Sequence, residues 1–216
     1  MVNGKPSGML TGPNLVSCID ELSLQDFDDL TRCTQLATRS ADLGYSRFLD
    51  SAQWMDEYVS TLNFLGWSVY GDSIFTRTRH WLGKTVAEFL VDGAQAMPDT
   101  RQGNAMIDTL DALKRDEPAQ FSLDEQSLMG ERFQVIPARY NSKGVIEMAV
   151  FNLELIANSK TSKFIYRDLE GHSAQIVQRR AYLKLDKEKF NSVKAVMEKK
   201  LREVTMTRFQ LQKFRP

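Results

Sequence analysis

The sequence predicts an α+β fold, in which N-terminal helices pack on a C-terminal antiparallel β-meander that an amphipathic helix closes. Apolar residues recur at helical spacing up to residue 118, and beyond it their period changes from about 3.6 to about 2 residues. The later strand-forming runs are separated by short polar turns, which is typical of a meander. We therefore expect one domain over residues 17–216, with a helical part over 17–118 and the β-meander with its closing helix over 119–216.

Turn-forming residues open the chain, and helices follow them. Residues 1–16 contain three glycines and two prolines, which predicts a flexible N-terminal arm. Ser23 is a candidate N-cap for the first helix, Ser51 opens the second, and Gly66 suits a left-handed C-cap after it. The apolar spacing predicts helices at Leu24 to Asp42, Ser51 to Leu65, Val86 to Ala94 and Met106 to Leu113, with Pro98 and Pro118 ending the last two.

The β-prone runs alternate as half-buried strands do. Two short runs, Trp67–Tyr70 and Ile74–Arg77, flank a Gly-Asp pair and are expected to form a hairpin. In the run Val145–Ile156 apolar residues occupy both parities, which predicts either a β-bulge or burial on both faces. The strands expected after residue 118 are Phe121–Leu123, Phe133–Ile136, Val145–Ile156, Phe164–Tyr166 and Ala174–Leu185.

The closing helix is expected to begin after Asp186, a good N-cap residue. Residues 206–214 fit either an edge strand or a frayed end of this helix. The strand before the helix is expected to turn Val177, Ala181, Leu183 and Leu185 to the core and Arg180, Tyr182 and Lys184 outward. Opposite its apolar stripe the helix carries a basic face, which consists of Lys187, Lys194, Lys199, Lys200 and Arg202.

Composition indicates an ordinary folded domain. The apolar fraction is 42% and the charged fraction 26%, and no apolar run approaches the ~20 residues that span a bilayer. The N-terminus lacks the apolar stretch of a signal peptide, so we expect a protein that is cytoplasmic as made, with export by a signal-independent route left open. Cys18 and Cys33 are expected to be reduced, mostly buried thiols rather than a disulfide.

Charge is unevenly distributed along this neutral chain. From Ala174 to Pro216, Lys and Arg outnumber Asp and Glu by 12 to 4, so the preceding residues carry an equal acidic excess of 8. Such asymmetry indicates either an intramolecular match between the two parts or a basic face that meets an anionic partner.

Few residues suited to catalysis or metal binding stand at diagnostic spacings. The only histidines are His80 and His172, and no HExxH, zinc-finger or EF-hand pattern is present. Residues 83–85 (Gly-Lys-Thr) resemble the end of a P-loop, but Thr78 replaces the first glycine of that motif and bulky residues fill the loop. Residues 171–175 resemble a nucleophile elbow without its second glycine, and a strand follows instead of a helix. We interpret both as structural segments, and we predict no cofactor and no metal.

The basic face of the last helix has two interpretations. It could dock on an anionic surface, namely phospholipid, nucleic acid or an acidic protein. The pattern favours the other interpretation, the solvated side of a helix whose apolar stripe covers the sheet, because Glu188, Glu198 and Glu203 interrupt the basic run. Nucleic acid is the least favoured partner, since no aromatic residues interleave with the basic ones.

The spacing Trp54-x-x-x-Tyr58, followed by Leu65-Gly66-Trp67, resembles a pattern found in a group of uncharacterised bacterial proteins. Residues 121–123, 133–135 and 183–185 are compatible with the same pattern, so the resemblance covers residues 20–205. It implies a helical first half, an antiparallel sheet, a closing helix and a bacterial origin. The group has no assigned activity, so the resemblance transfers no functional residue.

Three hypotheses for function follow. The leading one is a non-enzymatic, toxin-like or effector-like protein that engages an anionic membrane surface or a protein partner through Lys187, Lys194, Lys199, Lys200 and Arg202. The second is an enzyme of unrecognised type, such as a hydrolase, whose carboxylates are brought together by folding. The third is a self-assembling subunit that joins copies of itself through edge strands of the meander.

Overall fold

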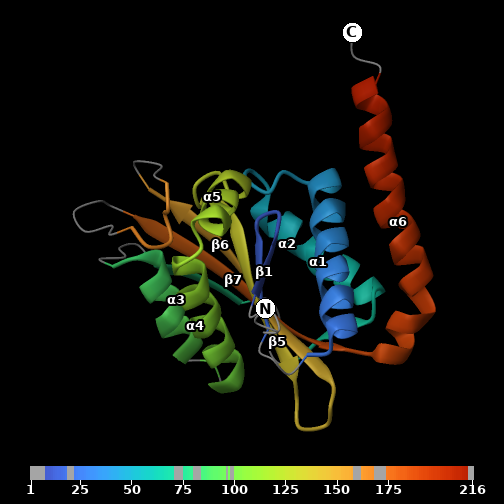
Figure 1. Ribbon diagram of the computed structural model, residues 1–216, viewed down its shortest axis with the longest axis horizontal. Coiled ribbons are helices and arrows are strands. Elements are labelled where there is room, and N and C mark those ends of the chain that lie inside the picture. The colour runs from blue at the N-terminus through green and yellow to red at the C-terminus, as the bar shows by residue number, and fades with distance from the viewer. Residues whose placement is uncertain are drawn as a thin grey trace, which may run out of the picture. The chain divides into compact units, whose positions relative to one another are not determined.

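The computed structural model describes residues 8–18, 22–70, 75–79, 84–95, 97, 100–157, 162–167 and 174–213. These contain six helices and seven strands, which confirms the predicted α+β class (Figure 1). The chain divides into two compact units. Unit 1 comprises Met1–Ser23 and Val69–Lys184, and unit 2 comprises Leu24–Ser68 and Leu185–Pro216. This division does not coincide with the expected boundary near residue 118, because each unit combines segments that are distant in sequence.

Unit 1 is built on a mostly antiparallel sheet. Its strands follow the order β1-β2-β5-β6-β7, and β4 also pairs with β7. Strands β5, β6 and β7 form the predicted meander, whereas β2 lies parallel to β5. The bounds are β1 Gly8–Thr11, β2 Asn14–Cys18, β4 Phe75–Arg79, β5 Phe133–Tyr140, β6 Ile146–Ile156 and β7 Gln175–Leu185.

Strand β6 is buried on both faces and contains no bulge. It pairs with β5 in one register from Phe133–Leu153 to Tyr140–Ile146, and with β7 without interruption from Glu147 to Ile156. All six residues from Met148 to Leu153 are buried. Of the two alternatives that the sequence left open, two-sided burial is therefore correct.

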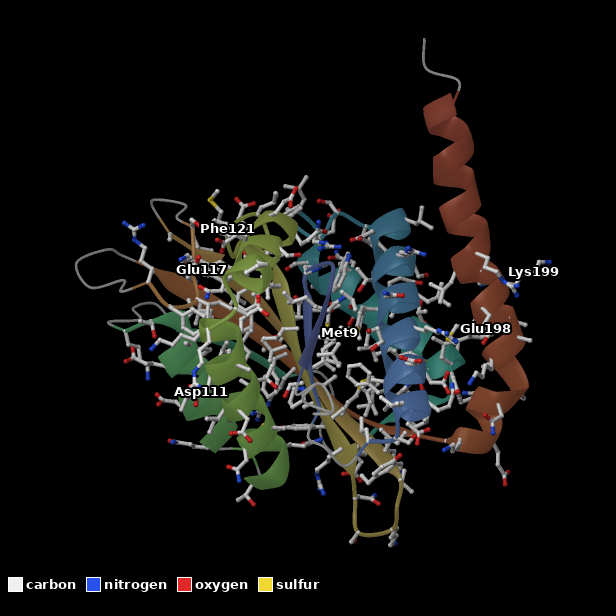
Figure 2. The ribbon with its side chains drawn as sticks, viewed as in Figure 1. Met9, Asp111, Glu117, Phe121, Glu198 and Lys199 are labelled. Atoms are coloured by element: carbon white, nitrogen blue, oxygen red, sulfur yellow. The ribbon has the colours of Figure 1, made fainter. Side chains whose placement is uncertain are left out.

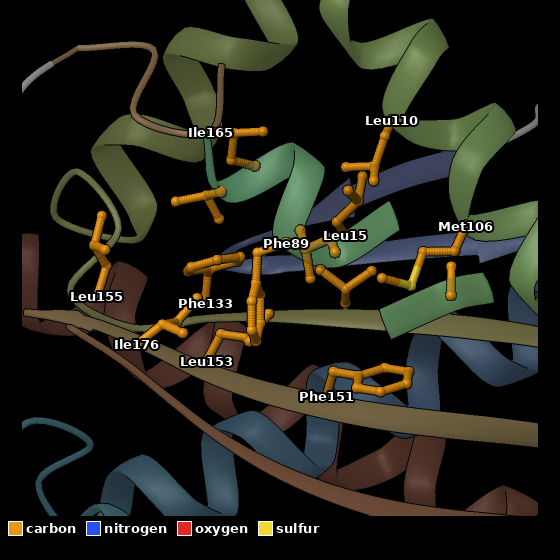
Figure 3. Close-up of a cluster of buried hydrophobic side chains, with 14 of the residues drawn as sticks. Leu15, Phe89, Met106, Leu110, Phe133, Phe151, Leu153, Leu155, Ile165 and Ile176 are labelled. Carbon is orange, nitrogen blue, oxygen red and sulfur yellow. The ribbon is translucent and has the colours of Figure 1, made fainter. Parts of the chain in front are cut away.

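One face of the sheet meets three helices, α3 (Val86–Gln95), α4 (Thr100–Lys114) and α5 (Glu117–Gln126), in a shared apolar core. Helix α4 can approach α3 closely because a Cβ at Gly103 would lie 2.3 Å from the carbonyl oxygen of Ala94. Ile176 and Tyr182 of β7 also pack on this core. The core includes Leu15, Phe89, Met106, Leu110, Phe133, Phe151, Leu153, Leu155, Ile165 and Ile176 (Figure 3).

The expected orientation of the last strand is only partly correct. Ala181, Leu183 and Leu185 are buried as predicted, but Tyr182, expected to face outward, packs on the unit 1 core through the other face. Because both faces of this sheet are covered, parity along one strand does not distinguish a core position from an outward one.

Two expected strands are wrong. Phe121 and Leu123 lie in α5, where the carboxylate of Asp116 accepts the Ala119 N–H at 3.0 Å and a proline occupies the first turn. This N-cap and the proline start a helix, so Pro118 opens α5 rather than only ending the helix before it. Residues 164–166 form a turn instead of a strand, since the backbone is left-handed at Lys163 (φ 56°).

The N-terminal arm and the first hairpin also need correction. Residues 8–18, most of which were assigned to a flexible arm, form the β1–β2 hairpin, with Gly12 (φ 58°) in its turn. The glycine and proline there shape a turn between two paired strands. Residues 1–7 lie outside the described part. Strand β4 pairs with β7 rather than with β3 (Trp67–Val69), so the hairpin expected around residue 71 is not formed.

Unit 2 consists of three helices, α1 (Leu24–Gly44), α2 (Ser51–Phe64) and α6 (Lys187–Lys213). Asp186 accepts the Lys189 N–H at 3.0 Å as the predicted N-cap, and the tail that the sequence left open is helical to Lys213. Cys33 is a free, buried thiol whose sulfur lies 3.8 Å from that of Met197. Burial raises the pKa of Cys33 to about 12. The side chain of Cys18 lies outside the described part.

Gly66 follows α2 and lies in close contact with the start of α6. Its φ is +92°, which confirms the left-handed residue expected after the second helix. Its carbonyl oxygen accepts the Asp186 N–H at 2.9 Å, and a Cβ at this position would lie 2.9 Å from both the Asp186 oxygen and the Phe190 nitrogen. Only glycine combines this φ with so close an approach of two backbones.

Gly66→Ala should therefore destabilise unit 2 by about 2–4 kcal/mol, through strain at positive φ and overpacking against the backbone of α6. Urea unfolding followed by circular dichroism measures the change. Gly44→Ala is the matched control, because a Cβ there meets nothing within 4 Å, and its stability should change by less than about 1 kcal/mol. Equal stability of the two variants would contradict the role assigned to Gly66.

Candidate functional site

Two of the five basic residues singled out in the sequence pair with acidic residues of α1. The ammonium group of Lys187 lies 3.0 Å from a carboxylate oxygen of Asp26, and that of Lys194 lies 2.7 Å from Asp29. The acidic side chains are only 8% and 10% exposed. Within unit 2, then, part of the basic excess of α6 neutralises buried carboxylates, which is the intramolecular match considered from the sequence.

The other three basic residues lie near the middle of α6. Lys200 places its ammonium group 5.5 Å from the ring centre of Phe64, and the Arg202 Nε donates to the Glu198 carbonyl oxygen at 3.3 Å. Glu198 pairs with Arg32 on α1, whereas Lys199 lies on the opposite, exposed side of the helix (Figure 2). Lys199, Lys200 and Arg202 thus form the exposed basic group of α6.

A second surface was missed from the sequence, namely the end of the α1–α2 hairpin. We call residues 43–49 the α1–α2 tip. Leu43 is 83% exposed and Leu49 86%, and the aromatic residues Tyr45 and Phe48 are 41% and 38% exposed. The available signal was the presence of four large apolar residues at the end of α1 and in its short connection to α2, because connections between helices are usually polar.

A polar cluster at the surface lies at the base of the tip. Arg47 forms a salt bridge with Asp42, with 2.5 Å between Nη2 and Oδ2, and its guanidinium lies 5.5 Å from the Trp54 ring centre. The indole N–H of the buried Trp54 donates to the same carboxylate at 2.8 Å. The charges of Arg47 and Asp42, next to the apolar side chains, therefore neutralise each other.

Hydrogen bonds around Ser46 order the tip itself. The Ser46 hydroxyl oxygen accepts the N–H groups of Phe48 and Leu49 at 3.3 and 3.2 Å. The Ser46 N–H donates to the Asp50 carboxylate at 3.3 Å, and the Asp50 N–H donates to the Ser46 carbonyl oxygen at 2.8 Å. This local network presents Leu43 and Leu49 outward on an ordered turn.

Unit 1 also presents exposed apolar side chains, at the end of α5. Leu128 (φ 52°) and Met129 (φ 57°) are 46% and 41% exposed and occupy the left-handed region, which L side chains rarely adopt. The Met129 N–H donates to the Asp124 carbonyl oxygen at 2.6 Å, and Gly130 follows with φ 91°. Backbone strain of this kind needs surrounding structure to maintain it.

The structure describes part of the two segments that resemble a P-loop and a nucleophile elbow. Thr85 and Glu88 exchange hydrogen bonds at the start of α3, with the Thr85 N–H donating to Glu88 at 2.8 Å and the Glu88 N–H donating to the Thr85 hydroxyl at 3.1 Å. This is a capping box, and the neighbouring Lys84 pairs with Asp92. His80, Gly83 and residues 168–173 lie outside the described part of the chain.

Two described pockets bear on an enzymatic reading. A pocket of about 270 Å³ in unit 1 contains Asp116 as its only carboxylate, and one of about 330 Å³ in unit 2 contains Glu198, which pairs with Arg32. Neither brings two carboxylates together. Within the described ranges, no group of three or more His, Cys, Asp or Glu side chains could hold a metal ion. No described helix is long and apolar enough to cross a membrane.

Comparison with protein-family models found no match, and no curated protein matches the chain. Among solved structures, the chain is similar to a delta-endotoxin, with a TM-score of 0.49 and 10% identity over 82% of this chain and 84% of that one. It is also similar to the Evf virulence factor, with a TM-score of 0.35 and 10% identity over 90% of this chain and 81% of that one. At these values the likeness carries no argument about function.

The pairing of Lys194 with Asp29 predicts a stability effect. Lys194→Ala should lower the free energy of unfolding by about 1–3 kcal/mol, because it leaves the nearly buried Asp29 carboxylate without its cation. Lys199→Ala, at an exposed position of the same helix, should change it by less than about 0.5 kcal/mol. Urea unfolding of both variants provides the comparison.

The double variant Lys194→Ala/Asp29→Asn separates charge from packing. It should recover most of the lost stability, because the buried charge is removed along with its partner. A double variant as unstable as the sum of the two single variants would show that the two residues act independently.

Proposed function

We propose that this protein is a non-enzymatic interaction protein that binds a membrane surface through the α1–α2 tip. The observation that carries the proposal is the exposure of Leu43 and Leu49, at 83% and 86%, on an ordered turn. Inserted into the interfacial region of a bilayer, these side chains would leave water without any change in the backbone around them.

The extent of the apolar surface is that of a functional patch. With areas of about 150–250 Å² for large apolar side chains, the exposed fractions of the four tip residues amount to apolar surface on the order of 500 Å². The largest apolar patch on a typical monomer covers about 300–600 Å² and is often functional. A bilayer can bind such a patch without a complementary surface, because each inserted side chain contributes independently.

The side-chain types and charges of the tip also fit a membrane interface. Tyr45 and Phe48 place aromatic rings beside the two leucines, and aromatic residues prefer the zone between headgroups and acyl chains. Arg47 and Asp42 neutralise each other at the base of the tip. Insertion of the tip therefore does not require a protein partner with a complementary charge.

The exposed basic group of α6 supplies a second contact with anionic headgroups. Helices α6 and α1 run in the same direction, since Lys187 pairs with Asp26 near the start of α1 and the Leu201 carbonyl oxygen accepts from Arg39 near its end. Lys199, Lys200 and Arg202 consequently lie nearer the tip than Lys187 and Lys194 do. Each cation near an anionic membrane contributes about 1 kcal/mol.

The proposal retains part of the expected function. A toxin-like or effector-like role is compatible with surface binding by an ordered apolar tip. Lys187 and Lys194 are no longer proposed as contacts, because they neutralise acidic residues of α1. The carboxylate-based hydrolase and the self-assembling subunit remain hypotheses, and neither described pocket supplies a carboxylate pair that would favour the hydrolase.

If the tip contacts the membrane, replacing its leucines should weaken membrane binding without affecting folding. Leu43→Ser/Leu49→Ser should weaken binding to phosphatidylcholine vesicles by more than about tenfold, because two inserted leucines are lost. Co-sedimentation with vesicles gives the binding constant. The salt concentration is about 150 mM, which is the physiological ionic strength.

Leu24→Ser is the matched control, because Leu24 is 65% exposed at the opposite end of α1. It should bind vesicles as the wild type does. Circular dichroism should show that all three proteins unfold at similar urea concentrations. Equal vesicle binding by the tip variant and the control would reject the tip as the membrane contact.

If the exposed basic group of α6 contacts headgroups, reversing its charge should weaken vesicle binding only where anionic lipid is present. Lys199→Glu/Lys200→Glu should weaken binding to vesicles that contain phosphatidylglycerol by more than about tenfold, and much less to vesicles of phosphatidylcholine alone. Raising the salt concentration should narrow the difference between wild type and variant on the anionic vesicles. A variant that binds both lipid compositions as the wild type does would show that these lysines do not contact the membrane.

A further inference from the structure

Strand β1 lies at one end of the described strand order in unit 1 and carries features of a strand-accepting edge. It pairs with β2 alone, through the hairpin whose closing pair is Thr11 and Asn14. Gly8, Met9 and Leu10 are partly exposed, in contrast to the buried residues of β2. Among the described residues no strand pairs with the side of β1 away from β2, and this edge can accept a further strand.

The hairpin geometry fixes which backbone groups point outward. A two-residue turn makes Thr11 and Asn14 a hydrogen-bonded pair, and bonded and non-bonded pairs alternate along an antiparallel ladder. Leu10 faces Leu15 and Gly8 faces Ser17 in non-bonded pairs. The N–H and C=O groups of Leu10 and Gly8 therefore point away from β2, in the positions that an added strand would use.

A pocket of about 270 Å³ lies beside this strand. Its walls are mainly apolar, and a Cβ at Gly8 would lie 2.6 Å from the Thr109 side chain, so the glycine keeps this side of β1 close to α4. The volume is just below the range of about 300–1,000 Å³ of small-ligand pockets and is large enough for an apolar side chain. The lining residues are Gly8, Met9, Leu10, Leu15, Thr109, Ala112, Leu113, Asp116 and Ala119.

Asp116 gives the pocket a negative charge. One of its carboxylate oxygens accepts the Ala119 N–H at 3.0 Å as the N-cap of α5, while the residue itself is exposed. The nearby cation Lys114 places its ammonium group 6.0 Å from the Tyr166 ring centre. A basic side chain on a bound segment would complement the Asp116 carboxylate.

We propose that β1 accepts an extended segment of a partner protein as an added strand. The segment carries an apolar side chain that enters the pocket and a Lys or Arg that pairs with Asp116. Backbone hydrogen bonds to Gly8 and Leu10 supply affinity, and the pocket and the carboxylate supply selectivity. This inference is independent of the α1–α2 tip.

Charge argues against a second copy of this chain as the occupant. In a symmetric pairing through β1, each copy would have to offer the β1–β2 hairpin to the other's pocket. Residues 8–18 contain no Lys or Arg, so the paired hairpin itself offers no basic partner to Asp116. A heterologous segment that contains a basic residue satisfies the site.

Selection from a displayed library of random heptapeptides on the immobilised full-length protein tests the proposal. The enriched peptides should alternate apolar and polar residues and share a Lys or Arg. A synthetic peptide of the enriched sequence should bind at least about tenfold more weakly to Ala112→Phe, whose added ring fills the pocket from an exposed position of α4. Asn104→Phe, at another exposed position of α4, is the matched control and should bind as the wild type does.

Asp116→Asn tests the charge separately, because asparagine is as good an N-cap as aspartate. This variant should retain its helix content but lose the preference for Lys or Arg in the selected peptides. On binding to the wild type, the amide resonances of Gly8 and Leu10 should shift in NMR spectra.

Three outcomes would overturn the proposal. They are selected peptides with no shared extended pattern, peptide binding that Ala112→Phe leaves unchanged, and a concentration-dependent dimer in sedimentation velocity that Ala112→Phe abolishes. The last would assign the edge to a second copy of the chain. Failure of vesicle binding would not affect any of these readouts.

Discussion

The two-sided burial of β6 is the constraint on which unit 1 depends. A strand whose residues are buried at both parities must lie inside its sheet and must be covered on both faces. The apolar run from Met148 to Leu153 meets this requirement, and the constant registers with β5 and β7 place it between two neighbours. Phe151 and Leu153 on one face then define the core that α3, α4 and α5 complete.

In unit 2 a different constraint, the pairing of buried charges, determines which cations are exposed. Asp26 and Asp29 are nearly buried, so their carboxylates need cations, and α6 supplies Lys187 and Lys194. The five basic residues of α6 that the sequence grouped together therefore divide into two that pair with α1 and three that are exposed. The candidate contacts are therefore the α1–α2 tip and the three exposed cations of α6, instead of all five basic residues.

Much of the fold followed from local patterns. The helices α1, α2, α3 and α6, the meander strands and the left-handed Gly66 were predicted because each has a strong local signal in apolar spacing or turn chemistry. The errors fall where local signals were weak or ambiguous. Residues 121–123 alternate like a strand, but the Asp116 cap and the proline after it nucleate a helix. Residues 8–18 look flexible in isolation and become ordered by pairing with β5, which is more than a hundred residues away.

The candidate surfaces were harder to predict, because exposure is a property of the assembled chain. The sequence identified the basic residues of α6 but could not distinguish Lys194, which neutralises Asp29, from the exposed Lys199. The sequence shows that Leu43 and Leu49 are apolar residues near a helix connection. Only the course of the chain shows that their side chains face outward. The pocket beside β1 combines residues 8–15 with residues 109–119, two segments that are distant in sequence.

By itself, the sequence determined the α+β class, most helices, the order of the meander and the shortage of catalytic motifs. These properties depend on residue type and on spacing over a few residues. Tertiary structure alone decided the parallel pairing of β2 with β5, the two-unit division, the partners of the α6 cations and the exposure of the tip. Those features arise from contacts between distant segments, whose free energies depend on geometry that no local pattern encodes.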